Sequence, residues 1–218
     1  MTNPREALFS RIRNALQRGE LSMTEKEALD ERMRRPAIHS QPKWESPNLD
    51  RFVDRLVAAE ATVASIDRVH TLPETIAQYM QRHKLPSELI MADDAELRQL
   101  SWKGITTYCG LNDGRHPVSL TPAYCGIAET GTLVLLSSAS SPTTLNFLSD
   151  HHIVLLPKQH IVRYIEDVWK RLRNEPQALP RTVNFITGPS RTADIEQTIQ
   201  LGAHGPRYLH VILLNDGI

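Results

Sequence analysis

Ile153-Val154-Leu155-Leu156 and Val211-Ile212-Leu213-Leu214 are the two stretches of sequence that decide the fold. Both are continuously apolar, without the alternation of polar and apolar residues that marks a half-buried strand. Strands of a parallel sheet are covered on both faces, so their sequences read as short apolar runs of this kind. Leu133–Leu136 and Val183–Ile186 have the same character. Together the four runs predict buried, mostly parallel strands.

Segments with helical periodicity lie between these runs. One helix is predicted from Ile161, Ile165, Val168, Trp169 and Leu172, and another is expected to start near Ser190–Asp194 and to carry Ile195 and Ile199. Upstream, the pattern predicts helices at Leu49–Val57, Pro73–His83 and Asp93–Leu100, and strands at Ala61–Ile66 and Glu88–Met91. Alternation of strand and helix favours right-handed crossovers. The expected fold is therefore α/β, with a mostly parallel sheet flanked by helices.

The first 47 residues differ from the remainder in composition. Asn3-Pro4 is a helix start signal, and a second, highly charged helix is expected from about Thr24 to Arg35. The stretch from Pro36 to Pro47 has little apolar content and is interpreted as a linker. We therefore divide the chain into a helical arm with its linker, residues 1–47, and a main domain, residues 48–218. A tethered arm is typical of segments that pack on another subunit, so a homo-oligomer is one expectation.

Charge and cysteine content restrict the classes of function. Lys plus Arg and Asp plus Glu both total 25, and this balance argues against a broad nucleic-acid or anionic-membrane surface. Two cysteines, Cys109 and Cys125, are too few to ligate an iron–sulphur cluster within the chain, so we expect reduced thiols. The sequence contains neither a signal-peptide core nor an apolar run long enough to span a membrane. The expected location is the cytoplasm.

The segment Ala128–Thr132 is the first candidate for chemistry, because it immediately precedes an apolar run. Gly131 permits a tight turn with positive φ or the close approach of a ligand. Partial burial would raise the pKa of Glu129 and suit it to acid–base or nucleophilic work, and Thr130 offers a hydroxyl for a ligand. The alternative is that Glu129 is simply a hydrogen-bonded carboxylate in a turn.

The segment Gly188–Glu196 is the second candidate, at the end of the run Val183–Ile186. If a helix begins there, its N-terminus would favour an anion near Gly188. Arg191 would clamp a carboxylate or phosphate, while Ser190 and Thr192 would cap the helix or bind a ligand oxygen. Asp194 and Glu196 would complement the dipole of this helix from its first turn. That stabilisation is also the structural alternative to a role in ligand binding. The segment matches neither a Walker loop nor a dinucleotide-binding fingerprint.

Histidines supply the third candidate. His204 lies in Gly202-Ala203-His204-Gly205-Pro206, a loop that would present an imidazole as an acid–base group or merely include it structurally. His151 and His152 are adjacent, so in a strand they would point to opposite faces. The histidines and cysteines do not have the spacings of common metal motifs, so we predict no metal site.

These segments together resemble the LUD-domain family of lactate utilization protein C. The residues that carry the resemblance are Ala128–Thr132, Gly188-Pro189-Ser190, Thr192–Glu196, Gly202 and His204-Gly205-Pro206. The resemblance implies a fold like that of the NagB/RpiA/CoA-transferase group. It also implies a part in the oxidation of L-lactate to pyruvate, together with two partner proteins that carry the iron–sulphur clusters. No cofactor is then expected in this chain itself.

One segment departs from the family pattern. Ser141–Ser149 lacks a basic residue that many relatives have there, and Ser149 stands where proline is common. If that basic residue binds an anion in the relatives, Arg191 or Arg115 must replace it here, or the ligand differs.

Three functions remain open from the sequence. The first is a subunit of a lactate-oxidising assembly that binds a small carboxylate or organises its partners. The second is a stand-alone enzyme of the CoA-transferase or sugar-phosphate-isomerase type that uses Glu129, an argument from fold analogy. The third is a binding or structural module in which these motifs only shape turns and caps.

Overall fold

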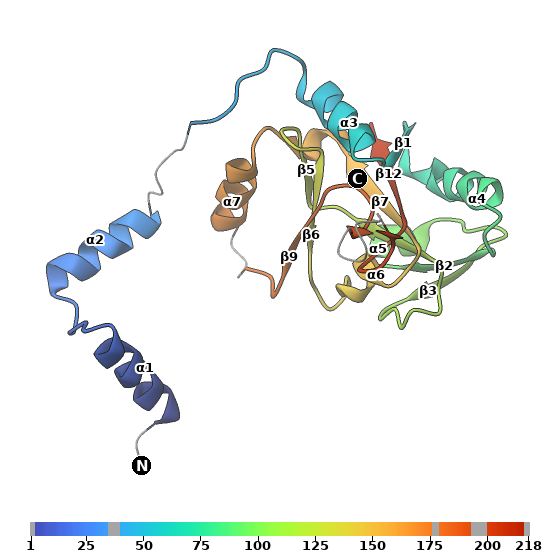
Figure 1. The fold of residues 1–218 in the computed structure, drawn as a ribbon. Helices are drawn as coiled ribbons and strands as arrows, with labels where there is room; N and C mark the ends of the chain where they lie inside the picture. The colour runs from blue at the N-terminus through green and yellow to red at the C-terminus, as the bar shows by residue number, and fades with distance from the viewer. Residues whose placement is uncertain (1–2, 35–39, 176–178, 193–199, 216–218) are drawn as a thin grey trace. The chain divides into compact units, whose positions relative to one another are not determined.

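The computed structural model describes residues 3–34, 40–175, 179–192 and 200–215 (Figure 1). Contacts divide the chain into two compact units, Met1–Pro42 and Lys43–Ile218. The helices are α1 (Pro4–Ala15), α2 (Met23–Arg34), α3 (Asn48–Ala58), α4 (Leu72–Arg82), α5 (Ala95–Gln99), α6 (Thr144–Phe147) and α7 (Ile165–Asn174), with short 3₁₀ turns η1 (Val69–Thr71) and η2 (Lys158–His160). The strands are β1 (Thr62–Ile66), β2 (Glu88–Met91), β3 (Thr106–Cys109), β4 (Val118–Pro122), β5 (Cys125–Ile127), β6 (Thr132–Leu136), β7 (His151–Pro157), β8 (Ile161–Val162), β9 (Val183–Ile186), β10 (Arg191–Thr192), β11 (Gln200–Leu201) and β12 (Tyr208–Leu214).

The smaller unit contains α1 and α2. The side chain of Asn3 accepts a hydrogen bond from the backbone N–H of Arg5, which confirms the predicted helix start. Neither helix has a buried residue, and Leu8, Phe9 and Ile12 of α1 and its C-cap residue Leu16 are exposed. Within the described residues, no helix combines the length and apolar character that a membrane span requires.

The larger unit is built on a six-stranded sheet in the order β1-β12-β7-β4-β2-β3, in which every pairing is parallel. The two runs that open the sequence, within β7 and β12, pair at the centre of this sheet, as predicted. Ile153 and Leu155 pack with α4, whereas Val154 and Leu156 pack with α3 and β6. Alternate side chains of β7 therefore serve two separate cores. The α/β architecture expected from the sequence is confirmed.

A second, four-stranded sheet in the order β8-β5-β6-β9 corrects part of the prediction. The runs Leu133–Leu136 and Val183–Ile186 pair with each other in antiparallel register, instead of joining the parallel sheet. These two runs are apolar for the same reason as the parallel strands, namely that both of their faces are buried. One face of this sheet packs on α3 and the larger sheet, and the other packs on α7. Figure 1 shows α7 on the side of β5 and β6 that faces away from the larger sheet.

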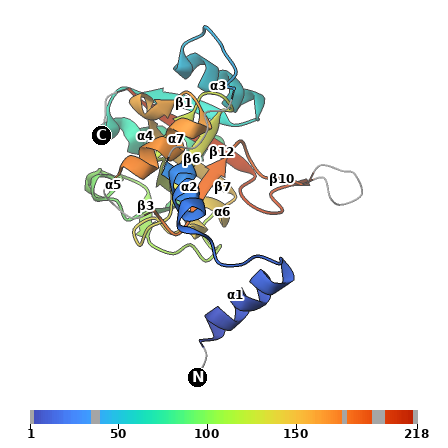
Figure 2. The same ribbon diagram turned by 90° about the vertical axis from the view of Figure 1, so that its left-hand side faces the viewer.

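Two helix predictions also change. The helix expected from Ile161 begins at Ile165, because Ile161 and Val162 form β8 and pair with β5. A helix was expected to start near Ser190–Asp194, but none begins at Ser190, Arg191 or Thr192, since Arg191 and Thr192 form β10 and pair antiparallel with Leu201 and Gln200. Asp194, Ile195, Glu196 and Ile199 lie outside the described residues. In Figure 2 the β10–β11 pair projects beyond the two larger sheets.

Gly131 occupies a turn that brings β5 back along β6 and against α3. Its φ is +69°, and an added Cβ would lie 2.5 Å from the backbone nitrogen of Leu56. The positive φ expected from the sequence is therefore present. The backbone that approaches Gly131 closely is that of α3.

Gly131→Ala should destabilise the protein far more than Gly104→Ala. Gly104 has a similar φ of +77° but nothing within 4 Å of an added Cβ. Both substitutions therefore incur the cost of a left-handed alanine, about 1–2 kcal/mol, and only Gly131→Ala adds a clash with backbone. Urea unfolding of the two variants measures the difference, and equal losses of stability would contradict this packing.

Candidate functional site

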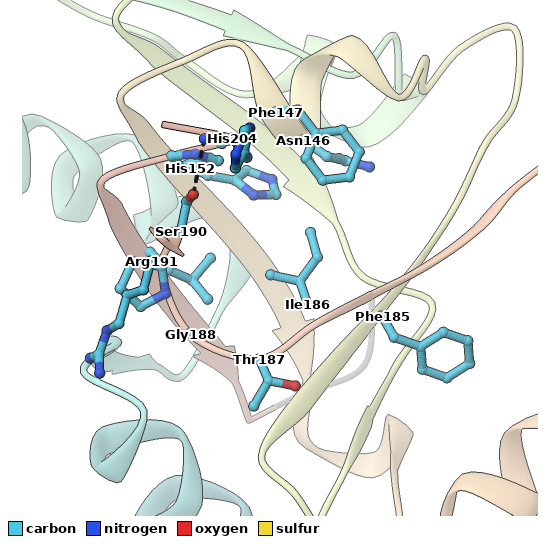
Figure 3. A pocket seen from close by; sticks show the side chains of 14 residues that line it. Asn146, Phe147, His152, Phe185, Ile186, Thr187, Gly188, Ser190, Arg191 and His204 are labelled. Carbon is cyan, nitrogen blue, oxygen red and sulfur yellow. Dashed lines mark hydrogen bonds between the residues drawn. The ribbon is translucent and has the colours of Figure 1, made fainter. Parts of the chain in front are cut away.

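A cavity of about 260 Å³ lies where the segment after β9 meets α6 and the amino ends of β7 and β12 (Figure 3). Its lining comprises Asn146, Phe147, His152, Phe185, Ile186, Thr187, Gly188, Pro189, Ser190, Arg191, His204, Gly205, Pro206 and Leu209. Part of the expected surface is thus assembled, because Gly188–Arg191 and the loop of His204 lie on one cavity. The volume is just below the usual range of ligand pockets, roughly 300–1,000 Å³, which suits a small ligand.

Asn146 and His152 form what we call the polar floor of the cavity. His152 is fully buried on β7, and its Nε2 lies 2.7 Å from the Thr121 hydroxyl on β4. Its Nδ1 is buried without a hydrogen-bond partner, and so is Oδ1 of Asn146, a residue with 2% exposure. Ser119 Oγ, beside His152 across the β4–β7 pairing, is another such atom but does not line the cavity.

Burial determines the charge of the floor. It lowers the pKa of His152 to about 3, because an imidazolium would lose its hydration there. The polar floor is therefore neutral at physiological pH. It can recognise a ligand through directed hydrogen bonds, but it supplies no counter-charge.

Ser190 and His204 form the rim. The backbone N–H of Ser190 donates to the Pro206 carbonyl at 2.8 Å, and Gly202 donates to the Ser190 carbonyl at 3.0 Å. The hydroxyl of Ser190 accepts from the backbone N–H of His204 at 3.3 Å. Ser190 thus fastens the glycine-rich loop to the segment after β9, and the exposed His204 is held at the entrance.

Arg191 is one of the lining residues, but its guanidinium points away from the polar floor. Its guanidinium forms an ion pair with Glu60 at 2.7 Å and donates to the Ala59 carbonyl at 3.3 Å. Figure 3 shows this group pointing away from Asn146 and His152. Gly188, at φ +74°, makes the turn, and an added Cβ would lie 2.3 Å from the same Ala59 carbonyl. The segment is therefore anchored to the end of α3, not to a helix start.

The Ala128–Thr132 turn lies outside the cavity lining. Glu129 is half-buried, and its backbone N–H donates to the Arg163 carbonyl at 3.1 Å. Hydroxyl contacts of 2.6 Å nevertheless join Thr130 to Thr132 and Thr132 to Thr187, which does line the cavity. The two candidate segments are thus neighbours across the β6–β9 pairing, but Glu129 itself does not reach the polar floor.

Ser149, in the segment Ser141–Ser149 that departs from the family pattern, forms hydrogen bonds within the protein, and Arg115 forms an ion pair. Ser149 Oγ accepts a hydrogen bond from Asn112 Nδ2 and donates to the His116 carbonyl, both at 2.8 Å. Arg115 is paired with Asp113 at 2.6 Å and is 84% exposed. Neither Arg115 nor Ser149 lines the cavity.

No group of three or more His, Cys, Asp or Glu side chains suited to a metal ion occurs among the described residues. Cys109 is exposed at the end of β3 and Cys125 is buried in β5. The two thiols lie in different sheets and are not paired.

Sequence reasoning missed Asn146, Phe147 and the role of His152. The available signal was the pair His151-His152 directly before the buried run of β7. As expected, the two rings serve opposite faces: His151 contacts Tyr79 of α4 at 2.9 Å, and His152 faces the cavity. Asn146 carried no comparable signal, because only the fold places α6 over β4 and β7.

Residues 114–214 match the LUD domain. In this stretch the chain is similar to proteins of the LUD-domain family. It is 26% identical to lactate utilization protein C 1 of Bacillus mycoides over 84% of this chain and 91% of that protein. It is also 35% identical to lactate utilization protein C of Anoxybacillus flavithermus, over 47% of this chain and 46% of that protein.

An uncharacterized protein of Neisseria meningitidis is 38% identical over 42% of this chain and 40% of its own length. The chain thus aligns with less than half of the Neisseria and Anoxybacillus proteins. A DUF162 family protein from Deinococcus radiodurans, known from a crystal structure, has the same fold, with a TM-score of 0.59 and 23% identity over 80% of this chain and all of that one.

Lowering the pH from about 6.5 to 4 should reduce the free energy of unfolding. Burial lowers the pKa of His152 to about 3 and those of His151 and His210 to about 4. In this window the unfolded chain binds more protons than the folded chain, so stability falls as pH falls, by up to about 1.4 kcal/mol per pH unit for each histidine. Urea titrations at several pH values test this, and His152→Gln should flatten the slope. A pH-independent midpoint would contradict the buried neutral histidines.

The two thiols should differ in reactivity. Cys109 is exposed, whereas Cys125 is fully buried and burial raises its pKa to about 12. We expect a thiol-disulfide reagent to label one thiol per native chain and the second only in denaturant. Cys109→Ser should remove the native labelling, and rapid labelling of that variant would contradict the burial of Cys125.

Proposed function

We propose that this chain works in lactate utilization and that the cavity holds a small carboxylate of that process. One observation carries the proposal: every residue that lines the cavity lies within the 114–214 match to the LUD domain. Relatives similar to this chain are named lactate utilization protein C. The small volume and mixed apolar and polar lining suit a ligand of that size.

We further propose that the chain contributes to the oxidation of L-lactate to pyruvate with two iron–sulphur partner proteins. Its two cysteines are too few for a cluster of its own, so electrons would pass to clusters held by the partners. The apolar side chains exposed on α1 make Met1–Pro42 the segment that we expect to meet a partner or a second copy.

The alternative is a stand-alone enzyme of the CoA-transferase or isomerase type with Glu129 as its nucleophile or base. That function requires the Glu129 carboxylate at a ligand cavity. Glu129 is not among the residues that line the cavity described here. The geometry therefore favours the lactate-utilization role.

Deleting the gene, in a host without a paralogue, should abolish growth on L-lactate as sole carbon source. The wild-type gene should restore growth, whereas Ile186→Phe should not, because the Ile186 side chain points into the cavity and its enlargement fills the space (Figure 3).

Ile165→Phe is the matched control for this experiment. Ile165 is the first residue of α7, is 41% exposed and does not line the cavity. This variant should support growth. Normal growth of the deletion strain on lactate would overturn the proposed function, and growth with Ile186→Phe would overturn the role of the cavity.

A further inference from the structure

The polar floor contains two buried polar atoms that have no hydrogen-bond partner in the folded protein. Oδ1 of Asn146 is an acceptor, and Nδ1 of His152 is a ring nitrogen whose role depends on the tautomer. A buried polar atom without a partner costs about 1–3 kcal/mol. Both residues line the same cavity, and Figure 3 shows them at the same end of it. Two of the unpartnered buried atoms among the described residues therefore belong to the lining of one cavity.

Thr121 determines the tautomer of His152. Its hydroxyl lies 2.7 Å from Nε2 of His152, and that is the hydrogen bond the hydroxyl forms in the described structure. If Nε2 carried the proton, the hydroxyl hydrogen of Thr121 would be left without an acceptor inside the protein. The arrangement that satisfies both groups has Thr121 donating to Nε2. The neutral ring then carries its proton on Nδ1, the unpartnered nitrogen, as a donor.

We propose that the polar floor binds a hydroxyl group, and that the ligand is a small 2-hydroxy monocarboxylate held with its hydroxyl inward. A single ligand hydroxyl satisfies the hydrogen bonding of both side chains, because it accepts from His152 Nδ1–H and donates to Asn146 Oδ1. The identification as a monocarboxylate rests on the proposed function. The recognition of a hydroxyl rests on the floor alone.

The rest of the cavity is compatible with this orientation. Ile186 and Leu209 provide apolar surface beside the floor for a short alkyl group. The floor carries no positive charge, and the Arg191 guanidinium is paired with Glu60. A carboxylate at the floor would therefore be buried without a counter-ion, at a high cost. It lies instead at the rim, near Ser190 and the exposed His204.

The floor also discriminates between oxidation states of the ligand. A 2-oxo acid presents only acceptors, so its keto oxygen leaves Asn146 Oδ1 without a donor. A simple alkanoate satisfies neither Asn146 nor His152. Sites that bind a hydroxyl by hydrogen bonds reject analogues that lack it, because buried polar groups are then left unpaired. The 2-hydroxy acid should consequently bind more tightly than both analogues.

Titration calorimetry of the full chain with L-lactate, pyruvate and propionate tests this inference, since the three differ only at the second carbon. We expect L-lactate to bind at least about tenfold more tightly than either analogue, as one well-formed buried hydrogen bond provides. Nitrogen NMR of the histidines gives a second readout. L-lactate should shift the His152 resonances, and His152→Gln identifies them.

Asn146→Leu separates recognition from folding. It should abolish the preference for L-lactate over propionate while leaving the thermal midpoint unchanged or higher, because it removes an unpartnered buried acceptor. His151→Gln is the matched control: His151 neighbours the floor residue on β7 but contacts Tyr79 on the opposite face. This control should retain the preference. A lower midpoint for Asn146→Leu with the preference intact would show a structural role only and overturn the inference.

The outcomes distinguish this inference from the proposed function. Equal binding of the three acids, or binding of none, overturns hydroxyl recognition, while a growth defect of the deletion strain on lactate would still uphold the function. A preference for L-lactate that depends on Asn146, in a strain that grows normally on lactate without the gene, upholds hydroxyl recognition and overturns the function.

Discussion

Strand β7 runs between β4 and β12, and all 7 of its residues are buried. Because successive side chains of a strand point to opposite faces, this burial obliges β7 to serve two cores at once. Ile153 and Leu155 belong to the core under α4, and Val154 and Leu156 to the core under α3 and β6. The same alternation separates His151 from His152. A shift of one residue in register would exchange the two rings and remove the polar floor.

The remaining walls of the cavity depend on the smaller sheet. Pairing of β6 with β9 brings Thr187 to Thr132 and fixes the point where the chain leaves β9. Gly188 then turns against α3, and Ser190 is bonded to the loop that carries His204. Three segments distant in sequence thus meet above the floor. Backbone hydrogen bonds from Ser190 to Pro206 and from Gly202 to Ser190 hold the loops of the cavity together.

The sequence predicts the central strands, because burial on both faces leaves a continuous apolar run as its signature. It does not distinguish the parallel strands from Leu133–Leu136 and Val183–Ile186, since a strand between a second sheet and α7 is equally apolar. The helix start expected near Ser190–Asp194 is wrong for Arg191 and Thr192, which form β10, for a related reason. The Ile195 and Ile199 spacing matches a helical period, whereas the pairing of β10 with β11 is a contact that local periodicity does not reveal.

The candidate site was predicted in part. Glycines at 131, 188 and 202 have positive φ, and glycine is the residue type that marks such turns, so the loops around the cavity could be located. Glu129 and Arg191 are suited to chemistry by residue type, but Glu129 lies outside the cavity lining and Arg191 is paired with Glu60. Asn146 and His152 matter because they are buried without complete partners, and that property exists only in the folded chain.

A high-resolution crystal structure of the full chain grown with L-lactate tests the central claim most directly. The account predicts that lactate occupies the cavity with its hydroxyl oxygen within hydrogen-bond distance, about 2.7–3.2 Å, of both Asn146 Oδ1 and His152 Nδ1. Its carboxylate should lie toward Ser190 and His204. Lactate bound elsewhere, or bound with its carboxylate on the polar floor, would contradict the account.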